Sequence, residues 1–113
     1  MTAPEIVIHL ESLGTEGYRR ILRNHGVTEP LFGVKIEELK KIQRSVKKNY
    51  RLALELYDTG IYDAMYLAGL IADEAKMTKD DLRAWLDTAS SDVAAEFTWP
   101  AWRRMDPMAG SWA

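Results

Sequence analysis

Hydrophobic positions recur along most of this chain with the period of an α-helix. In IEELKKIQRSVKK, residues 36–48, they stand three or four residues apart: Ile36, Leu39, Ile42 and Val46. On a helix this spacing gives one narrow apolar stripe that packs against a core. The segment IYDAMYLAGLIAD, residues 61–73, is apolar almost all round, which predicts a buried helix.

Caps and breakers divide this pattern into short helices. Pro4 suits the first turn of a helix, and Gly14 follows the last apolar position of the same segment. Thr15 is placed to cap a second helix, while Thr78 and Asp81 have the spacing of a capping box. No stretch predicts a strand convincingly. We therefore expect about seven short helices, over residues 4–14, 16–26, 36–48, 50–58, 61–73, 78–87 and 91–99.

Such a series of helices predicts an all-α fold. Short helices with tight connections usually pack as antiparallel pairs, either in a bundle or in an α-solenoid. One pair per roughly 40 residues is compatible with HEAT-like repeats, although periodicity alone supports a plain bundle equally well. We expect one domain over residues 1–113, with an irregular tail at 103–113, where proline, glycine and aromatic residues are scattered.

Charge is unevenly distributed, although the formal net charge of the whole chain is −2. Residues 18–51 carry ten Lys or Arg against three acidic residues, whereas residues 52–113 carry five against eleven. On a helix through 36–48 the cations lie opposite the apolar stripe, which suits contact with a phosphate backbone. The candidate DNA-binding residues are Lys40, Lys41, Arg44, Lys47, Lys48 and Arg51.

Two other interpretations of this basic helix stay open. Lys and Arg are good helix formers, and a solvated face with ordinary pairs such as Glu37 with Lys41 explains them without any ligand. A helix lying on a membrane surface fits less well, because the apolar stripe is short and contains neither Trp nor Phe.

Other chemistry finds little support in the sequence. The chain has no cysteine, and His9 and His25 lie in separate predicted helices, so we expect no metal site. Neither a P-loop nor a dinucleotide-binding glycine pattern is present, and we expect no cofactor. No apolar run approaches the roughly 20 residues that span a bilayer. The lack of cysteine and of a basic N-terminal region favours a cytoplasmic location without a membrane.

Three short stretches are informative through their order and spacing. They are FGVKIEELKKI at 32–42, LALELYDTG at 52–60, and MYLAGLIAD at 65–73 followed by Met77 and Thr78. Together they resemble the AlkD-like DNA alkylation repair family, over roughly residues 15–100. The resemblance implies an all-α superhelix of HEAT-like helix pairs, with a basic concave face that cradles duplex DNA. It also implies glycosylase activity that removes alkylated purines without a metal ion.

Catalysis in the resembled family depends on tryptophans around an essential Asp, in a segment that reads approximately W-D-x-x-D. The stretch TASSDVAAEFTWPAW at 88–102 has no Trp-Asp pair. It offers a substitute set, in which a carboxylate stabilises a cationic sugar beside aromatic rings: Glu96, Asp92, Trp99 and Trp102. Helix packing or a terminal interface explains the same tryptophans without catalysis, and Asp92 also suits a helix start.

Members of the resembled family are roughly twice as long as this chain. Four tryptophans fall in its last 29 residues, which suggests that a second copy or a second half covers the C-terminal end: Trp85, Trp99, Trp102 and Trp112. The first hypothesis is a HEAT-like module that binds the backbone of double-stranded DNA and assists or performs removal of alkylated purines. The second is a glycosylase that uses the substitute set. The third is a non-catalytic protein-interaction scaffold whose apolar C-terminal end docks a partner, and a homodimer through that end is one form of it.

Overall fold

The computed structural model describes residues 1–73 and 75–95 of the 113-residue chain. In these ranges it contains seven helices and no strand, which confirms the all-α prediction. The helices are α1 (Ala3–Leu13), α2 (Glu16–Asn24), α3 (Ile36–Val46), α4 (Tyr50–Asp58), α5 (Tyr62–Ile71), α6 (Lys79–Thr88) and α7 (Asp92–Ala95). Each overlaps a segment predicted as helical, and only α1 and α6 extend beyond the predicted range, by one residue each. Of the last predicted segment, 91–99, the structure describes only the first part.

Local side-chain caps explain where several helices begin. Thr15 accepts a hydrogen bond from the Tyr18 amide, and Thr78 and Asp81 form the predicted capping box at the start of α6. Thr2 and Asn49 cap α1 and α4 in the same way, which the sequence pattern alone did not single out. Each such cap stabilises a helix by about 1 kcal/mol, so the chain sets most helix starts by local chemistry.

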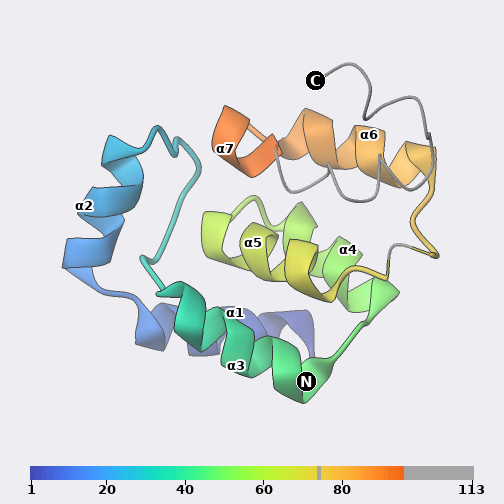
Figure 1. Cartoon of the computed structure of the whole chain (residues 1–113), viewed down its shortest axis with the longest axis horizontal. Helices are drawn as coiled ribbons and strands as arrows, with labels where there is room; N and C mark the ends of the chain where they lie inside the picture. Colours follow the sequence, from blue (N-terminus) through green and yellow to red (C-terminus); the bar gives the residue numbers. More distant parts are fainter. Residues whose placement is uncertain (74, 96–113) are drawn as a thin grey trace.

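Successive helices after α3 alternate between two layers. Contacts between helices place α1, α4 and α6 in one layer and α3, α5 and α7 in the other. In Figure 1 the helices stand in three rows, α1 with α3, α4 with α5, and α6 with α7. The pair α4 and α5 has the most extensive contact, and α1 packs against both of them. Helix α2 lies at one edge of the molecule (Figure 1). This arrangement is that of stacked helix pairs, as predicted for a HEAT-like solenoid.

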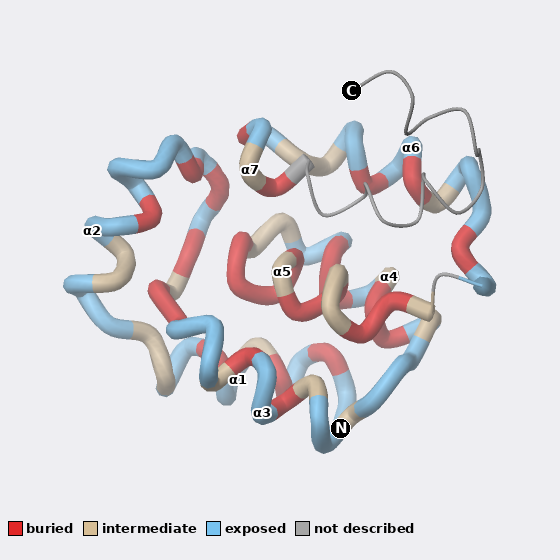
Figure 2. The backbone as a smooth tube through the Cα atoms, in the orientation of Figure 1, coloured by how far each residue is buried: buried red, intermediate tan, exposed pale blue. Residues whose placement is uncertain are grey.

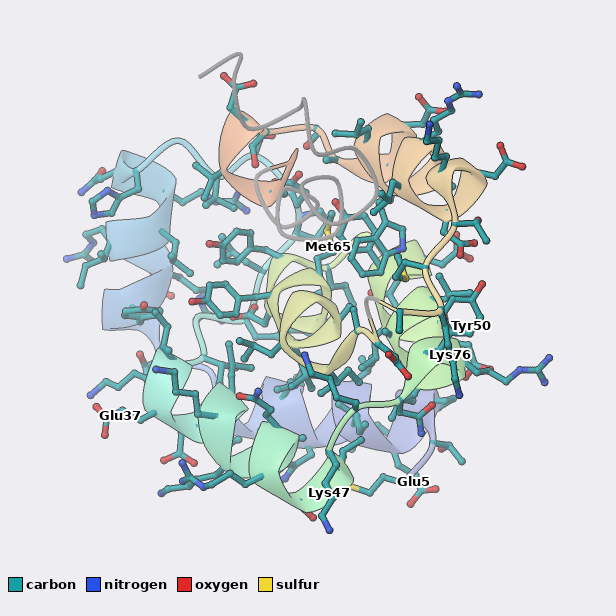
Figure 3. The ribbon with its side chains drawn as sticks, turned by 45° about the vertical axis from the view of Figure 1, so that its right-hand side comes forward. Glu5, Glu37, Lys47, Tyr50, Met65 and Lys76 are labelled. Atoms are coloured by element: carbon teal, nitrogen blue, oxygen red, sulfur yellow. The ribbon has the colours of Figure 1, made fainter. Side chains whose placement is uncertain are left out.

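Helix α5 forms the centre of the core. Most of its side chains are buried, including Met65 and Leu67 with no exposed surface, and the buried colour runs along it in Figure 2. Met65 lies in the middle of the molecule in Figure 3. The prediction of a buried helix over 61–73 is therefore confirmed.

Trp85 belongs to this core and not to an exposed end. Its ring stacks on that of Tyr57, with centroids 4.1 Å apart and planes 1° apart. Helical period explains the position, because Leu82 and Trp85 are three residues apart on the side of α6 that packs inward. The burial of Trp85 is therefore explained by α4 and α6 alone and does not require a second copy or a second half of the chain. Trp99, Trp102, Trp112 and the tail at 103–113 lie outside the described residues.

Two buried carboxylates hold the connection between α2 and α3 in place. Asp63 of α5 accepts hydrogen bonds from the Phe32 amide at 2.6 Å and from the Val34 amide at 3.0 Å. Glu29 lies in the connection itself and accepts from the amides of Ser90 and Ser91 at the start of α7. The connection is therefore tied to α5 and α7, and it fixes where α3 begins.

Gly33 is required in this connection. Its φ is +80°, and a Cβ there would lie 2.5 Å from the carbonyl oxygen of Thr15. The amide of Thr15 in turn donates to the Gly33 carbonyl at 3.0 Å. Because only glycine combines this backbone with so close an approach, Gly33 brings the start of α2 against the segment that leads into α3.

Candidate nucleic-acid interface

Helix α3 has the amphipathic form that its sequence predicts. Leu39 and Ile42 are buried, while Lys40, Lys41 and Arg44 are exposed. Ile36 departs from the prediction, because 37% of its surface is exposed. The reason is its angular position, since Ile36 lies at the edge of the apolar stripe, one turn before Lys40 on the same line of the helix.

The basic segment does not continue as a helix beyond Val46. Lys47 has φ 63° and ψ −165°, a conformation found almost only in glycine, so α3 ends there. The prediction of one continuous basic helix to residue 48 is therefore wrong at this end. The cause is tertiary, because Asn49 must cap α4 and its amide donates to the Ile71 carbonyl at 2.8 Å. Figure 3 shows Lys47 at the end of α3, with its side chain directed away from the body.

Lys48 is directed toward the end of α5. Its ammonium nitrogen donates to the carbonyl oxygen of Leu70 at 3.4 Å, and the side chain of Gln43 donates to the same oxygen at 3.3 Å. The last carbonyls of a helix have no partner within it and carry partial negative charge, which favours a cation there. Lys48 thus has a structural contact that the sequence did not reveal.

The Gln43 contact also shows on which side the cations of α3 lie. Lys40 lies three residues before Gln43 and four before Arg44, so it is a neighbour of both on the helix surface. Because the Gln43 side chain reaches the Leu70 carbonyl at the end of α5, Lys40 lies next to the side of α3 that adjoins α5. Five exposed cations lie along or just after this helix, and Lys48 is set apart from the others by its contact with Leu70. We call the remaining four the α3 basic surface: Lys40, Lys41, Arg44 and Lys47.

The other predicted cation, Arg51, is not part of this surface. It is exposed in the first turn of α4, in the opposite layer, and shares a helix face with Glu55 and Asp58. The structure thus divides the six predicted DNA-binding residues. Three lie on α3, Lys47 and Lys48 lie in the connection that follows, and one lies on α4.

Ion pairs reduce the number of available cations in the described part of the chain. Lys41 pairs with Glu38 at 3.1 Å, and not with Glu37 as expected, while Arg19 of α2 pairs with Glu16 at 2.6 Å. The arginine contact holds the pKa of Glu16 below its usual value, through its hydrogen bond and its charge. Among residues 1–73 and 75–95, the structure gives no ion pair to Lys40, Arg44 or Lys47.

Arg23, also in the basic part of the sequence, supports the fold. One of its guanidinium nitrogens donates to the carbonyls of Val27 and Glu29, each at 2.9 Å. Arg23 therefore stabilises the turn after α2. The charge counted in residues 18–51 is thus shared between structural contacts and a smaller free set on and after α3.

Only one member of the predicted catalytic set is described. Asp92 lies exposed in the first turn of α7, where a carboxylate is favourable in any case. Glu96, Trp99 and Trp102 lie outside the described residues, so the set stays a prediction.

Sequence reasoning missed the two buried carboxylates, Glu29 and Asp63. Burial alone would raise the pKa of Glu29, but hydrogen bonds from Ser91 and Ser90 outweigh it and hold the pKa below its usual value. Both oxygens of each carboxylate accept hydrogen bonds from the chain itself. These groups therefore serve the fold and are not free bases.

Among residues 1–73 and 75–95, no group of three or more His, Cys, Asp or Glu side chains lies close enough together to hold a metal ion. No helix in that part of the chain has the length and apolar character needed to cross a membrane.

Comparison with known proteins decides the family. Residues 6–105 match the family described as DNA alkylation repair enzyme. The chain belongs to the DNA alkylation repair family. Two curated relatives are similar to this member over 103 residues: uncharacterized protein Lin0241 of Listeria innocua at 34% identity and uncharacterized protein Lmo0209 of Listeria monocytogenes at 32%. Each alignment covers 88% of this chain and 43% of the relative, so the chain spans less than half their length.

One solved structure is similar to this family member in fold and sequence. It is described as "a new family of proteins related to the HEAT-like repeat DNA glycosylases with affinity for branched DNA structures". The match has a TM-score of 0.77 and 41% identity, and covers 83% of this chain and 40% of the other. The HEAT-like interpretation of the two-layered fold is therefore confirmed over the plain bundle.

Proposed function

We propose that this member of the DNA alkylation repair family is a HEAT-like module that binds the phosphate backbone of DNA through the α3 basic surface. The observation that carries the proposal is the state of Lys40, Arg44 and Lys47. They are exposed, they have no ion pair among the described residues, and they lie along or just after one rigid helix. Cations in this arrangement release counterions from DNA and position it without reading its sequence.

The dimensions of the surface suit a short stretch of one strand. Seven residues separate Lys40 from Lys47, which corresponds to about 10 Å along a helix. Phosphates of one strand follow each other every ~3.4 Å along the duplex axis, so the surface covers about three of them. The similar structure is described as having affinity for branched DNA. We therefore expect tighter binding to a three-way junction than to a duplex of equal length.

Fluorescence anisotropy with labelled duplex and junction DNA tests the proposal. For about three phosphate contacts, affinity should fall about 40-fold between 50 mM and 200 mM salt. The triple variant Lys40→Glu, Arg44→Glu, Lys47→Glu should lose binding to both DNAs. The matched control changes three exposed cations elsewhere and should keep binding: Lys76→Glu, Lys79→Glu and Arg83→Glu. If both triple variants lost DNA binding equally, the change in net charge alone would explain the loss, and a specific role of the α3 basic surface would be refuted.

A direct assay separates this role from base excision. We propose that the module assists repair by holding DNA and does not itself excise bases, because its sequence has no Trp-Asp pair in the stretch 88–102. Release of 7-methylguanine from methylated DNA by an excess of the chain, abolished by Glu96→Gln, would contradict this and support the substitute catalytic set. The scaffold alternative predicts that neither DNA binding nor release is seen.

A further inference from the structure

A groove lies between α4 and α6, in the layer that does not carry the α3 basic surface. It has a volume of about 340 Å³, at the lower end of the range for ligand sites. The residues that line it include Leu54 and Trp85, together with three carboxylates, Glu55, Asp58 and Asp81. No Lys or Arg is among the described residues that line it. The lining of the groove thus combines apolar side chains with negative charge.

The carboxylate of Asp81 is held in its ionised form. The hydroxyl of Tyr50, labelled in Figure 3, donates to it at 2.6 Å, and the amide of Thr78 donates at 3.0 Å. Burial acts to raise the pKa of Asp81, but these hydrogen bonds outweigh it and keep the pKa below its usual value. Glu55 and Asp58 are exposed on α4, with no ion pair to any described residue. A groove of this charge repels DNA and attracts a cationic partner with an apolar side chain.

The same chain carries a surface with the complementary features. Ile36, the first residue of α3, is one of the few large hydrophobic side chains exposed in the described part of the chain. Lys35 precedes it and Lys40 lies one turn beyond it, and both are exposed. An aliphatic side chain flanked by two ammonium groups matches a lining that combines apolar side chains with carboxylates. The opposite charges of residues 18–51 and 52–113 would also orient two approaching copies in this way.

We propose that the α4–α6 groove binds the start of α3, with the α3 basic surface, of a second copy of this chain. Ile36 enters the groove over Leu54 and Trp85, and the cations beside it face Glu55 and Asp58. The two surfaces are different and lie in opposite layers, so the contact is head to tail and extends to short chains of copies. A contact limited to one helix start and one groove is small, so we expect it to be weak and sensitive to salt.

Self-association of this kind has a consequence for DNA binding, which rests on the proposed function. The same cations cannot contact a groove and a phosphate backbone at once. DNA should therefore dissociate the copies from each other. A high concentration of the protein should in turn lower the apparent affinity of each copy for DNA. The groove of a second copy thus competes with DNA for the α3 basic surface and covers it when no DNA is present.

Sedimentation velocity across concentrations up to about 1 mM tests the contact, at about 50 mM and 500 mM salt. At low salt the average mass of the wild-type chain should rise above 12.9 kDa with concentration, and at high salt it should not. Short duplex DNA should reverse the rise. A mass of 12.9 kDa throughout would overturn the proposal.

Two double variants make the test specific. The groove variant Glu55→Lys, Asp58→Lys and the surface variant Lys40→Glu, Arg44→Glu should each stay monomeric at low salt. An equimolar mixture should form a 1:1 dimer and no larger species, because the groove variant keeps its α3 and the surface variant keeps its groove. Association that survives in the groove variant alone would assign the contact to another surface, such as the C-terminal end, and overturn the proposal.

The same variants separate this proposal from the proposed function. The groove variant should bind DNA at least as well as the wild-type chain, and the surface variant should not bind it. If the chain binds DNA but does not self-associate, the groove contact is refuted and the proposed function stands. If the chain self-associates but does not bind DNA, the proposed function is refuted and the groove contact stands. Circular dichroism of each variant shows that the helices are intact.

Discussion

Glu29 offers the sharpest test of how the fold holds α3. Only 3% of this residue is exposed, and its carboxylate accepts three hydrogen bonds. The Ser90 amide donates at 2.7 Å, the Ser91 amide at 3.0 Å and the Ser91 hydroxyl at 2.6 Å. The Ser91 hydroxyl oxygen in turn accepts from the Ala94 amide at 3.2 Å, so the carboxylate supports the first turn of α7.

The cost of removing this carboxylate follows from these bonds. A hydrogen bond to a charged group contributes about 1.5–3 kcal/mol, and a buried amide left without an acceptor costs a similar amount. Because the three bonds share one group, we expect Glu29→Ala to lower the free energy of unfolding by about 3–5 kcal/mol. Glu29→Gln keeps one oxygen acceptor and loses the charge, so it should cost about 1–2 kcal/mol.

The effect of pH distinguishes a charged acceptor from simple packing. The pKa of Glu29 is held low in the folded chain, so the carboxylate contributes stability above its unfolded value of about 4.5. That contribution is lost as the pH falls through the folded pKa. The difference in stability between wild type and Glu29→Gln should therefore be constant near neutral pH and should shrink below pH 4.5.

Urea unfolding followed by circular dichroism measures these differences. The matched control is Glu11→Gln, which removes the same charge from an exposed position on α1 and should change the free energy of unfolding by less than about 0.5 kcal/mol. A Glu29→Gln variant as stable as wild type at pH 7, or a difference independent of pH, would refute the view that Glu29 acts as a charged acceptor.

Three other substitutions test single features of the fold by the same urea measurement. Gly33→Ala should destabilise by at least about 2 kcal/mol, because its Cβ meets the Thr15 carbonyl at a positive φ; a smaller effect would mean that this approach can relax. Lys47→Gly should stabilise by about 1 kcal/mol through relief of backbone strain and should weaken DNA binding; unchanged stability would contradict the strain. Asp63→Asn should cost about 2 kcal/mol, because its amide group would face one of two donor amides, and a neutral result would show that the linker finds other acceptors.

Most of the helices could be predicted because their signals are local. The stripe of Leu39 and Ile42 and the cap formed by Thr78 and Asp81 involve residues within one turn of each other. Helix periodicity and capping both depend on residues three or four positions apart, so a short stretch of sequence is enough to predict these helices.

The features that could not be predicted depend on contacts between distant parts of the chain. Asp63 binds amides 29 and 31 residues away, and Glu29 binds Ser91 across 62 residues. The apolar segment 61–73 places Asp63 in a buried helix, but nothing near either acid in the sequence identifies the amides that it binds. The end of α3 has the same origin, because Lys47 adopts an unfavourable conformation so that Asn49 can meet Ile71. Lys47 and Lys48, which the sequence pattern places on the helix, therefore lie beyond the end of α3.

The arrangement of charge in the two layers connects these findings. Buried acids are used as acceptors for backbone amides, so they hold α3 in place and leave no free buried carboxylate among the described residues. The exposed acids of Glu55 and Asp58 lie on α4, in the layer opposite the cations of α3. DNA that follows the α3 basic surface would meet little repulsion from them. The fold thus turns a chain with a net charge of −2 into one with a separate basic surface, which is what backbone binding requires and what net charge alone would not suggest.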